Sequence, residues 1–97
     1  MPAAYLISES QVFDQELMDE YAQKAGPSVA AYGGELIAAT TNVAHMDGMS
    51  KPPRIVMIRF ESMEKAKEWY NCPEYQAVLP MRFRASNSSV YFVEAVE

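Results

Sequence analysis

Two segments of the chain are apolar on both sides of the strand that each is predicted to form. The first is Arg54–Phe60, where Ile55 and Met57 alternate with Val56, Ile58 and Phe60. The second is Val90–Val96, where Val90, Phe92 and Val96 alternate with Tyr91, Val93 and Ala95. A strand of this kind must be covered on both faces of its sheet. With 97 residues the chain has the length of one domain, residues 1–97, whose helices can cover only one face. The other face is predicted to meet a second copy of the chain in a two-fold homodimer.

The first half of the chain predicts a strand, a helix and a second strand. Ala4–Ser10 is a short run of strand formers. A helix follows, with Asp14 as its N-cap and an apolar face formed by Leu17, Met18, Tyr21 and Ala25. We expect Gly26-Pro27 to break this helix and Gly33-Gly34 to stop a further short turn. Glu35–Thr41 is the second strand candidate.

The second half repeats this pattern after a loop. Asn42–Pro53 is predicted as a long hairpin connection or as a lid over a site. After the strand Arg54–Phe60, Ser62 caps a helix that ends near Asn71, and Pro73 starts a further helical turn that Pro80 should bend or break. The order β-α-β-β-α-β predicts an α+β, ferredoxin-like fold, in which a four-stranded antiparallel sheet carries its helices on one face.

Charge and cysteine content narrow the partners and the location. The chain holds 13 acidic and 8 basic residues, a net charge of −5, which argues against nucleic acid as a partner. Residues 1–50 carry a net −6 and residues 51–97 a net +1, so an anion should be met by the second half. A single cysteine, Cys72, allows no internal disulfide and favours the cytoplasm. The sequence contains neither a signal peptide pattern nor an apolar run long enough to span a membrane.

Few side chains are suited to metal binding or nucleophilic catalysis. One histidine and one cysteine are too few for a metal site, and none is predicted. His45, two residues before Asp47, is either a loop residue without a special role or a general base at the mouth of a pocket. Cys72 is expected to be a small buried or capping residue rather than a nucleophile.

Aromatic and arginine side chains are the candidates for a ligand site. Trp69 and Tyr75 either fill the core or line an apolar cavity. Arg82 and Arg84 either hold a carboxylate or enolate oxygen, or pair with acidic residues or with the last carbonyls of their helix. Arg54 carries the same ambiguity.

Several motifs together resemble a bacterial domain-of-unknown-function family, number thirteen-thirty. The resemblance covers nearly the whole chain. It rests on Ala31-Tyr32-Gly33-Gly34, Pro52-Pro53-Arg54, Phe60 with Ser62, Glu64 and Ala66, Trp69-Tyr70-Asn71-Cys72-Pro73-Glu74-Tyr75-Gln76, Leu79-Pro80-Met81-Arg82-Phe83-Arg84, and Val93-Glu94. It implies a dimeric α+β barrel without a cofactor, related in structure to cofactor-free monooxygenases, lactone isomerases and dehydratases that bind small aromatic or acidic compounds between sheet and helices.

The chain departs from the family pattern at two places. Ala39-Thr40-Thr41 stands where the family has Arg-Gly-Gly, so an anion-binding role of that arginine is absent. Cys72 stands where the family has Ser, which is the better N-cap.

Two hypotheses about function follow. In the first, a small molecule binds under the loop Asn42–Pro53, with or without being turned over, in a cavity where Arg54 and Arg82 hold an anion. Tyr32, Trp69 and Tyr75 form its walls, Arg84 is a further ligand candidate and His45 a weak candidate for the base. In the second, the chain is a non-catalytic dimeric structural or interaction module, whose aromatic residues are core and whose arginines pair with carboxylates.

Overall fold

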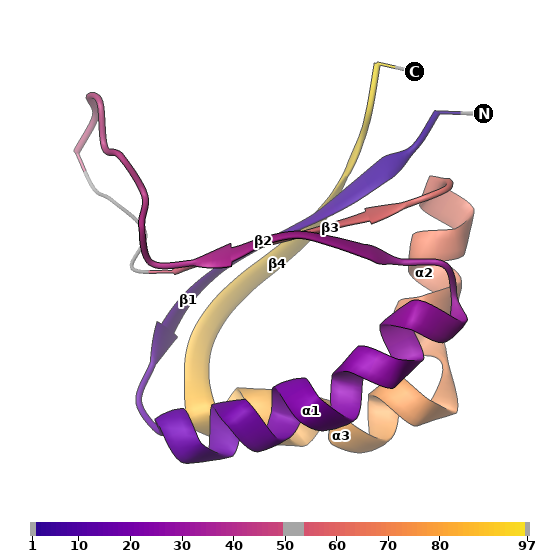
Figure 1. Ribbon diagram of the computed structural model, residues 1–97, viewed down its shortest axis with the longest axis horizontal. Coiled ribbons are helices and arrows are strands. Elements are labelled where there is room, and N and C mark those ends of the chain that lie inside the picture. The colour runs from indigo at the N-terminus through magenta and orange to yellow at the C-terminus, as the bar shows by residue number, and fades with distance from the viewer. Residues whose placement is uncertain (1, 50–53, 97) are drawn as a thin grey trace.

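The computed structural model describes residues 2–49 and 54–96, and in these ranges a four-stranded antiparallel sheet carries three helices on one face (Figure 1). The elements, in chain order, are β1 (Ala4–Val12), α1 (Gln15–Ala31), β2 (Glu35–Thr40), β3 (Ile55–Phe60), α2 (Met63–Asn71), α3 (Pro73–Ala85) and β4 (Ser86–Glu94). The strands lie side by side in the order β2-β3-β1-β4. This arrangement confirms the predicted ferredoxin-like fold, with α2 and α3 together in the place of its second helix.

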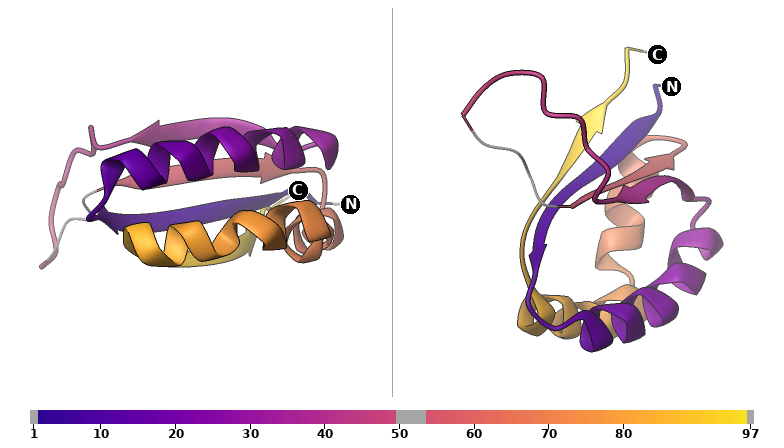
Figure 2. Two further views of the ribbon diagram at one scale, coloured as in Figure 1. Left: turned by 90° about the horizontal axis from the view of Figure 1, so that it is seen from below. Right: turned by 60° about the vertical axis from the view of Figure 1, so that its left-hand side comes forward.

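The two long helices lie next to each other beneath the sheet. In the left view of Figure 2, which looks at the sheet from the helix side, α1 lies in front of β2 and β3, and α3 lies in front of β1 and β4. These helices contact each other, whereas α2 packs at one end of the sheet. In the described ranges no helix is both long and apolar enough to cross a bilayer.

Side-chain caps and a glycine turn set the ends of the helices, as the sequence predicts. Asp14 Oδ1 accepts a 3.0 Å hydrogen bond from the Leu17 amide at the start of α1, and Ser62 Oγ accepts one of 3.1 Å from the Lys65 amide at the start of α2. At the end of α1, Gly33 has a φ of +77° and the Gly34 amide donates to the Val29 carbonyl, which is a Schellman motif. This confirms that Gly33-Gly34 stops the helix.

The predicted helix break at Gly26-Pro27 is wrong, because α1 continues through this pair to Ala31. Proline has no N–H to donate to the carbonyl one turn earlier in the helix, but Pro27 faces solvent, so water can bond to that carbonyl. The neighbouring Ser28 is buried in the core. Likewise α3 is not broken at Pro80, which is exposed while Leu79 is buried. Tertiary contacts on either side outweigh the low helix propensity of proline at both places.

Strand β4 is longer at its start than the sequence predicts. It begins at Ser86, and Ser86, Asn87, Ser88 and Ser89 pair with the second half of β1. Polar residues have low strand propensity, but here the Ser88 hydroxyl contacts that of Ser86 within β4 and donates to that of Ser10 across the two strands. The strand ends at Glu94, so Val96 lies outside it.

Both faces of the sheet carry apolar side chains, but the outer face is more exposed and also carries charged residues, among them Glu9 and Arg59. The inner face carries Ala4, Leu6, Ile58 and Phe60 into a core that also contains Ala66, Trp69, Tyr75 and Leu79. The outer face carries Tyr5, Ile7, Ile55, Met57, Tyr91 and Val93. No helix covers this face in the described ranges, and Tyr91 and Val93 are each 45% exposed. The structure therefore confirms that β3 from Ile55 to Ile58 and the edge strand β4 from Val90 to Val93 are apolar on both sides.

Candidate functional site

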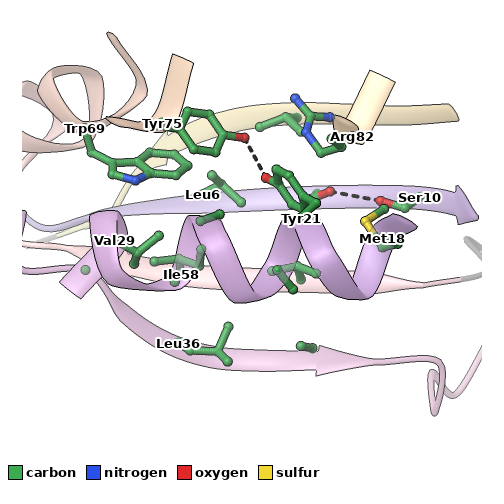
Figure 3. A pocket seen from close by; sticks show the side chains of 18 of the residues that line it. Leu6, Ser10, Met18, Tyr21, Val29, Leu36, Ile58, Trp69, Tyr75 and Arg82 are labelled. Carbon is green, nitrogen blue, oxygen red and sulfur yellow. Dashed lines mark hydrogen bonds between the residues drawn. The ribbon is translucent and has the colours of Figure 1, made fainter. Parts of the chain in front are cut away.

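A cavity of about 330 Å³ lies between α1 and the inner face of the sheet. Helix α1 forms one wall and all four strands form the opposite wall, while Trp69, Tyr75 and Arg82 close the side formed by α2 and α3 (Figure 3). Leu36, at 62% exposure, lies at the open β2 edge. The volume is at the lower end of the range for pockets that hold small organic ligands.

The wall formed by the strands, here called the floor of the cavity, changes from polar to apolar along the strands. At one end Ser10 of β1 stands between Arg54 at the start of β3 and Ser88 of β4. Four residues away along β1, Leu6 stands between Ile58 and Phe92, and Ser8 lies between these two levels. A bound molecule therefore meets cationic and hydroxyl groups at one end and hydrocarbon at the other.

Four buried or half-buried serines join the polar end of the floor to α3. The Ser86 hydroxyl donates to the Arg82 carbonyl at 2.9 Å and contacts the Ser88 hydroxyl at 2.7 Å. Ser88 donates to Ser10 at 3.0 Å, and Ser10 contacts Ser8 at 3.2 Å. This serine row fixes the backbone of the last turn of α3 against the sheet, and with it the position of Arg82.

Arg82 is a buried cation without an acidic partner among the described residues. It is 6% exposed, it lines the cavity, and its Nε has no hydrogen-bond partner. Its guanidinium lies 5.2 Å from the centre of the Phe83 ring. No Asp or Glu lines the cavity within the described part of the chain. A buried charge that lacks a counter-ion is costly, so this guanidinium is suited to an anion supplied from outside.

Two tyrosine hydroxyls meet on the cavity wall between Trp69 and Arg82 (Figure 3). The Tyr21 and Tyr75 oxygens are 2.7 Å apart, and the Tyr75 ring stacks on Trp69 with 4.1 Å between ring centres. Burial, and then the adjacent Tyr75, raise the pKa of Tyr21 well above its ordinary value, against a smaller opposite effect of the Arg82 charge. The Tyr21 hydroxyl is therefore neutral near pH 7.

The structure brings four of the predicted site residues to the cavity and leaves three away from it. Arg54, Trp69, Tyr75 and Arg82 are on its wall. Tyr32 caps the end of α1 with its ring 5.9 Å from the Lys65 amine, and Arg84 is on the exposed side of α3.

His45 is exposed in the connection between β2 and β3, where its Nε2 is 2.7 Å from the Asp47 carbonyl oxygen. Residues 41–49 of this connection extend beyond the end of the sheet (Figure 1) and line no part of the cavity. Ser50, Pro52 and Pro53 lie outside the described residues. The connection is thus a long link between two adjacent antiparallel strands, as one of the two interpretations of the sequence predicts.

Cys72 has the structural role that the sequence predicts. It is 4% exposed, and its Sγ accepts a 3.4 Å hydrogen bond from the Tyr75 amide at the N-terminus of α3. The thiol therefore still caps the helix that carries Tyr75 and Arg82, although cysteine replaces the serine of the family pattern.

Comparison with known proteins agrees with this fold. A family model described as a domain of unknown function (DUF1330) matches residues 3–96. The chain belongs to the DUF1330 family. No curated protein is similar enough in sequence to count as a relative.

Solved structures share the fold of this DUF1330 domain at low sequence identity. RPA0582, a protein of unknown function from Rhodopseudomonas palustris, aligns over 99% of this chain and 84% of its own, with a TM-score of 0.80 and 13% identity. SnoaB, a cofactor-independent oxygenase from Streptomyces nogalater, aligns over 100% and 96%, with a TM-score of 0.70 and 11% identity. A dimeric protein with a ferredoxin-like fold from Bacteroides fragilis aligns over 96% of each chain, with a TM-score of 0.63 and 11% identity.

The sequence did not single out three polar residues of the DUF1330 cavity, namely Ser8, Ser10 and Tyr21. The serines could have been found, because they fall in the same strand phase as Ala4 and Leu6 and so interrupt an otherwise apolar inner face. Tyr21 matched the apolar stripe of α1, and nothing local distinguishes its hydroxyl from that of any core tyrosine.

Proposed function

We propose that the cavity binds a small organic anion with an apolar or aromatic body. The observation that carries the proposal is the buried guanidinium of Arg82, which faces a cavity without acidic residues in the described part of the chain. In a protein of net charge −5, a buried arginine with no carboxylate beside it is unexpected unless a ligand supplies the negative charge.

The polarity of the cavity supports one orientation of this ligand. The acidic group lies at the end formed by Arg54, Ser10 and Arg82, and the apolar body lies against Leu6, Ile58 and Trp69. Arg54 adds a second cation at the polar end of the cavity.

The same arrangement suits chemistry that needs no cofactor. A guanidinium that holds a carboxylate or enolate oxygen stabilises the carbanion-like state through which isomerisation and dehydration beside a carbonyl proceed. Cofactor-independent oxygenation, the activity named for SnoaB, is a third reaction that this fold hosts. We propose Arg82 as the group that stabilises such an anion.

Ligand-induced stabilisation tests the proposal. Wild type, Arg82→Gln and Arg84→Gln are unfolded thermally with benzoate, phenylacetate and hydrocinnamate, and with the corresponding neutral amides. At a hundredfold excess over Kd a bound acid should add about 2.7 kcal/mol to wild type and to Arg84→Gln. The added stability should vanish in Arg82→Gln, whose ligand-free unfolding shows whether it folds. If no acid stabilises wild type, the cavity is no ligand site and the alternative, a non-catalytic dimeric structural or interaction module, is favoured.

We also propose that a second copy of the chain covers the outer face of the sheet. The apolar side chains of that face and the dimeric ferredoxin-like protein from Bacteroides fragilis support this arrangement. Cavity and interface lie on opposite faces, so each can be altered separately.

A further inference from the structure

The Tyr21 and Tyr75 hydroxyls have one more hydrogen than their contact uses. Each phenol carries one hydrogen and can accept through its oxygen. The two oxygens meet in one contact of 2.7 Å, which consumes one of the two hydrogens. No other group among the described residues accepts a hydrogen bond from either hydroxyl, although both side chains line the cavity. One O–H donor on the wall is therefore unused.

The surroundings of the pair fix what it can bind. Tyr75 is 2% exposed, held between the rings of Trp69 and Tyr70, so its hydroxyl cannot turn away to solvent. Burial raises the pKa of Tyr21, which keeps this phenol a donor rather than a base. The nearby Arg82 guanidinium disfavours a cationic ligand group. A neutral or partly negative oxygen acceptor is the complementary partner.

The pair also has a definite place along the cavity. It lies between Arg82 and Trp69, away from the polar end of the floor (Figure 3). A ligand whose acidic group pairs with Arg82 and whose body reaches Trp69 therefore passes the two hydroxyls. An oxygen carried on that body would accept the unused hydrogen.

We propose that the cavity is built for oxo acids, in which Arg82 binds the carboxylate and the Tyr21–Tyr75 pair donates a hydrogen bond to a carbonyl oxygen of the body. This substrate class rests on the proposed function, since it assumes that an organic anion enters the cavity. An enolate oxygen formed from the same carbonyl would be held at the same place.

Matched ligands test this second contact by calorimetric titration. Phenylpyruvate is compared with hydrocinnamate, and β-benzoylpropionate with phenylbutyrate, so that each pair differs by one carbonyl oxygen. The wild type should bind at least one oxo acid about five times more tightly than the matched acid without the carbonyl oxygen, which is the effect of one neutral hydrogen bond. The double variant Tyr21→Phe/Tyr75→Phe should bind both members of that pair equally. It should fold, because removing both partners of a hydrogen bond leaves no buried polar group unbonded.

Control variants separate this role from packing. Tyr70→Phe loses the same atom from a ring that touches Tyr75 but does not line the cavity, and should keep the preference. Each single variant, Tyr21→Phe or Tyr75→Phe, still has one free hydroxyl hydrogen. It should therefore keep part of the preference for the oxo acid.

Three results would overturn the inference. Equal binding of oxo and deoxo acids to wild type would refute it and leave the proposed function intact, as would a preference that survives in the double variant. Absence of binding by every acid would refute the proposed function and this inference together.

Discussion

The indole Nε1 of Trp69 in α2 donates a 3.0 Å hydrogen bond to the Oγ of Ser28 in α1. Ser28 donates in turn to the Ala25 carbonyl at 2.7 Å, and both side chains are buried. The contact joins the part of α1 that follows Gly26-Pro27 to the core. It therefore helps to hold the wall of the cavity in a helical conformation that the local sequence disfavours.

Ser28→Ala should destabilise the protein by about 1–3 kcal/mol, because it leaves the Trp69 N–H buried without an acceptor. Urea denaturation measures the change. Ser89→Ala removes the same atom at an exposed position of β4 and should change the free energy of unfolding by less than about 0.5 kcal/mol. Equal stability of the two variants would mean that the indole contact contributes nothing.

Two glycine-to-alanine substitutions should differ in their effect on stability. A Cβ at Gly34 would lie 2.5 Å from Val29 Cγ1 and 2.9 Å from Phe60 Cε1, so Gly34→Ala should cost about 1–3 kcal/mol through overpacking. A Cβ at Gly26 meets no atom within 4 Å apart from its chain neighbours, but Pro27 disfavours the helical conformation of a preceding residue that carries a Cβ. This cost offsets the gain in helix propensity, so Gly26→Ala should change the free energy of unfolding by less than about 0.5 kcal/mol. Calorimetric Tm values measure both changes. A stabilised Gly34→Ala would contradict the close approach of Gly34 to Val29 and Phe60.

The fold was predictable because its signals are local or periodic. The run of strand-forming residues in Arg54–Phe60 and the caps at Asp14 and Ser62 depend on neighbouring residues alone. The continuity of α1 was not predictable, since it depends on Ser28 and Trp69, which are 41 residues apart. The early start of β4 likewise depends on hydroxyl contacts between Ser88 and Ser10 that only the folded sheet creates.

The site was predictable only in part, because the sequence shows which residue types are present but not which way their side chains point. Arg82 and Arg84 were equivalent candidates in the sequence. In α3 they are two positions apart and so point to different sides. Arg82 points into the cavity and Arg84 to solvent. Tyr75 likewise lines the cavity, whereas Tyr32 packs against the core at the end of α1. The pairing of Tyr21 with Tyr75 joins α1 to α3 and has no counterpart in local sequence.

Stability should fall above pH 10 in a way that depends on Tyr21. Its folded-state pKa is raised above the ordinary value of 10.0, so the native protein keeps a proton that the unfolded chain releases. This stabilising contribution is complete below pH 10 and is lost as the pH rises toward the folded-state pKa. Tyr21→Phe should therefore reduce the slope of unfolding free energy against pH by up to about 1.4 kcal/mol per pH unit. Urea denaturation between pH 9 and 11.5 measures it, and identical slopes for variant and wild type would contradict the assignment.

The outer face of the sheet should hold two copies of the chain together, and one strand offers a matched pair of substitutions. Ile7 stands between Met57 and Tyr91 in the middle of this face, whereas Gln11 lies on the same face at the exposed end of β1. Light scattering at micromolar concentration should give twice the chain mass for wild type and for Gln11→Lys. Ile7→Lys should give a monomer, because the interface would bury its charge without a partner. A monomeric wild type would leave the apolar outer face uncovered by a second copy and would refute the dimer.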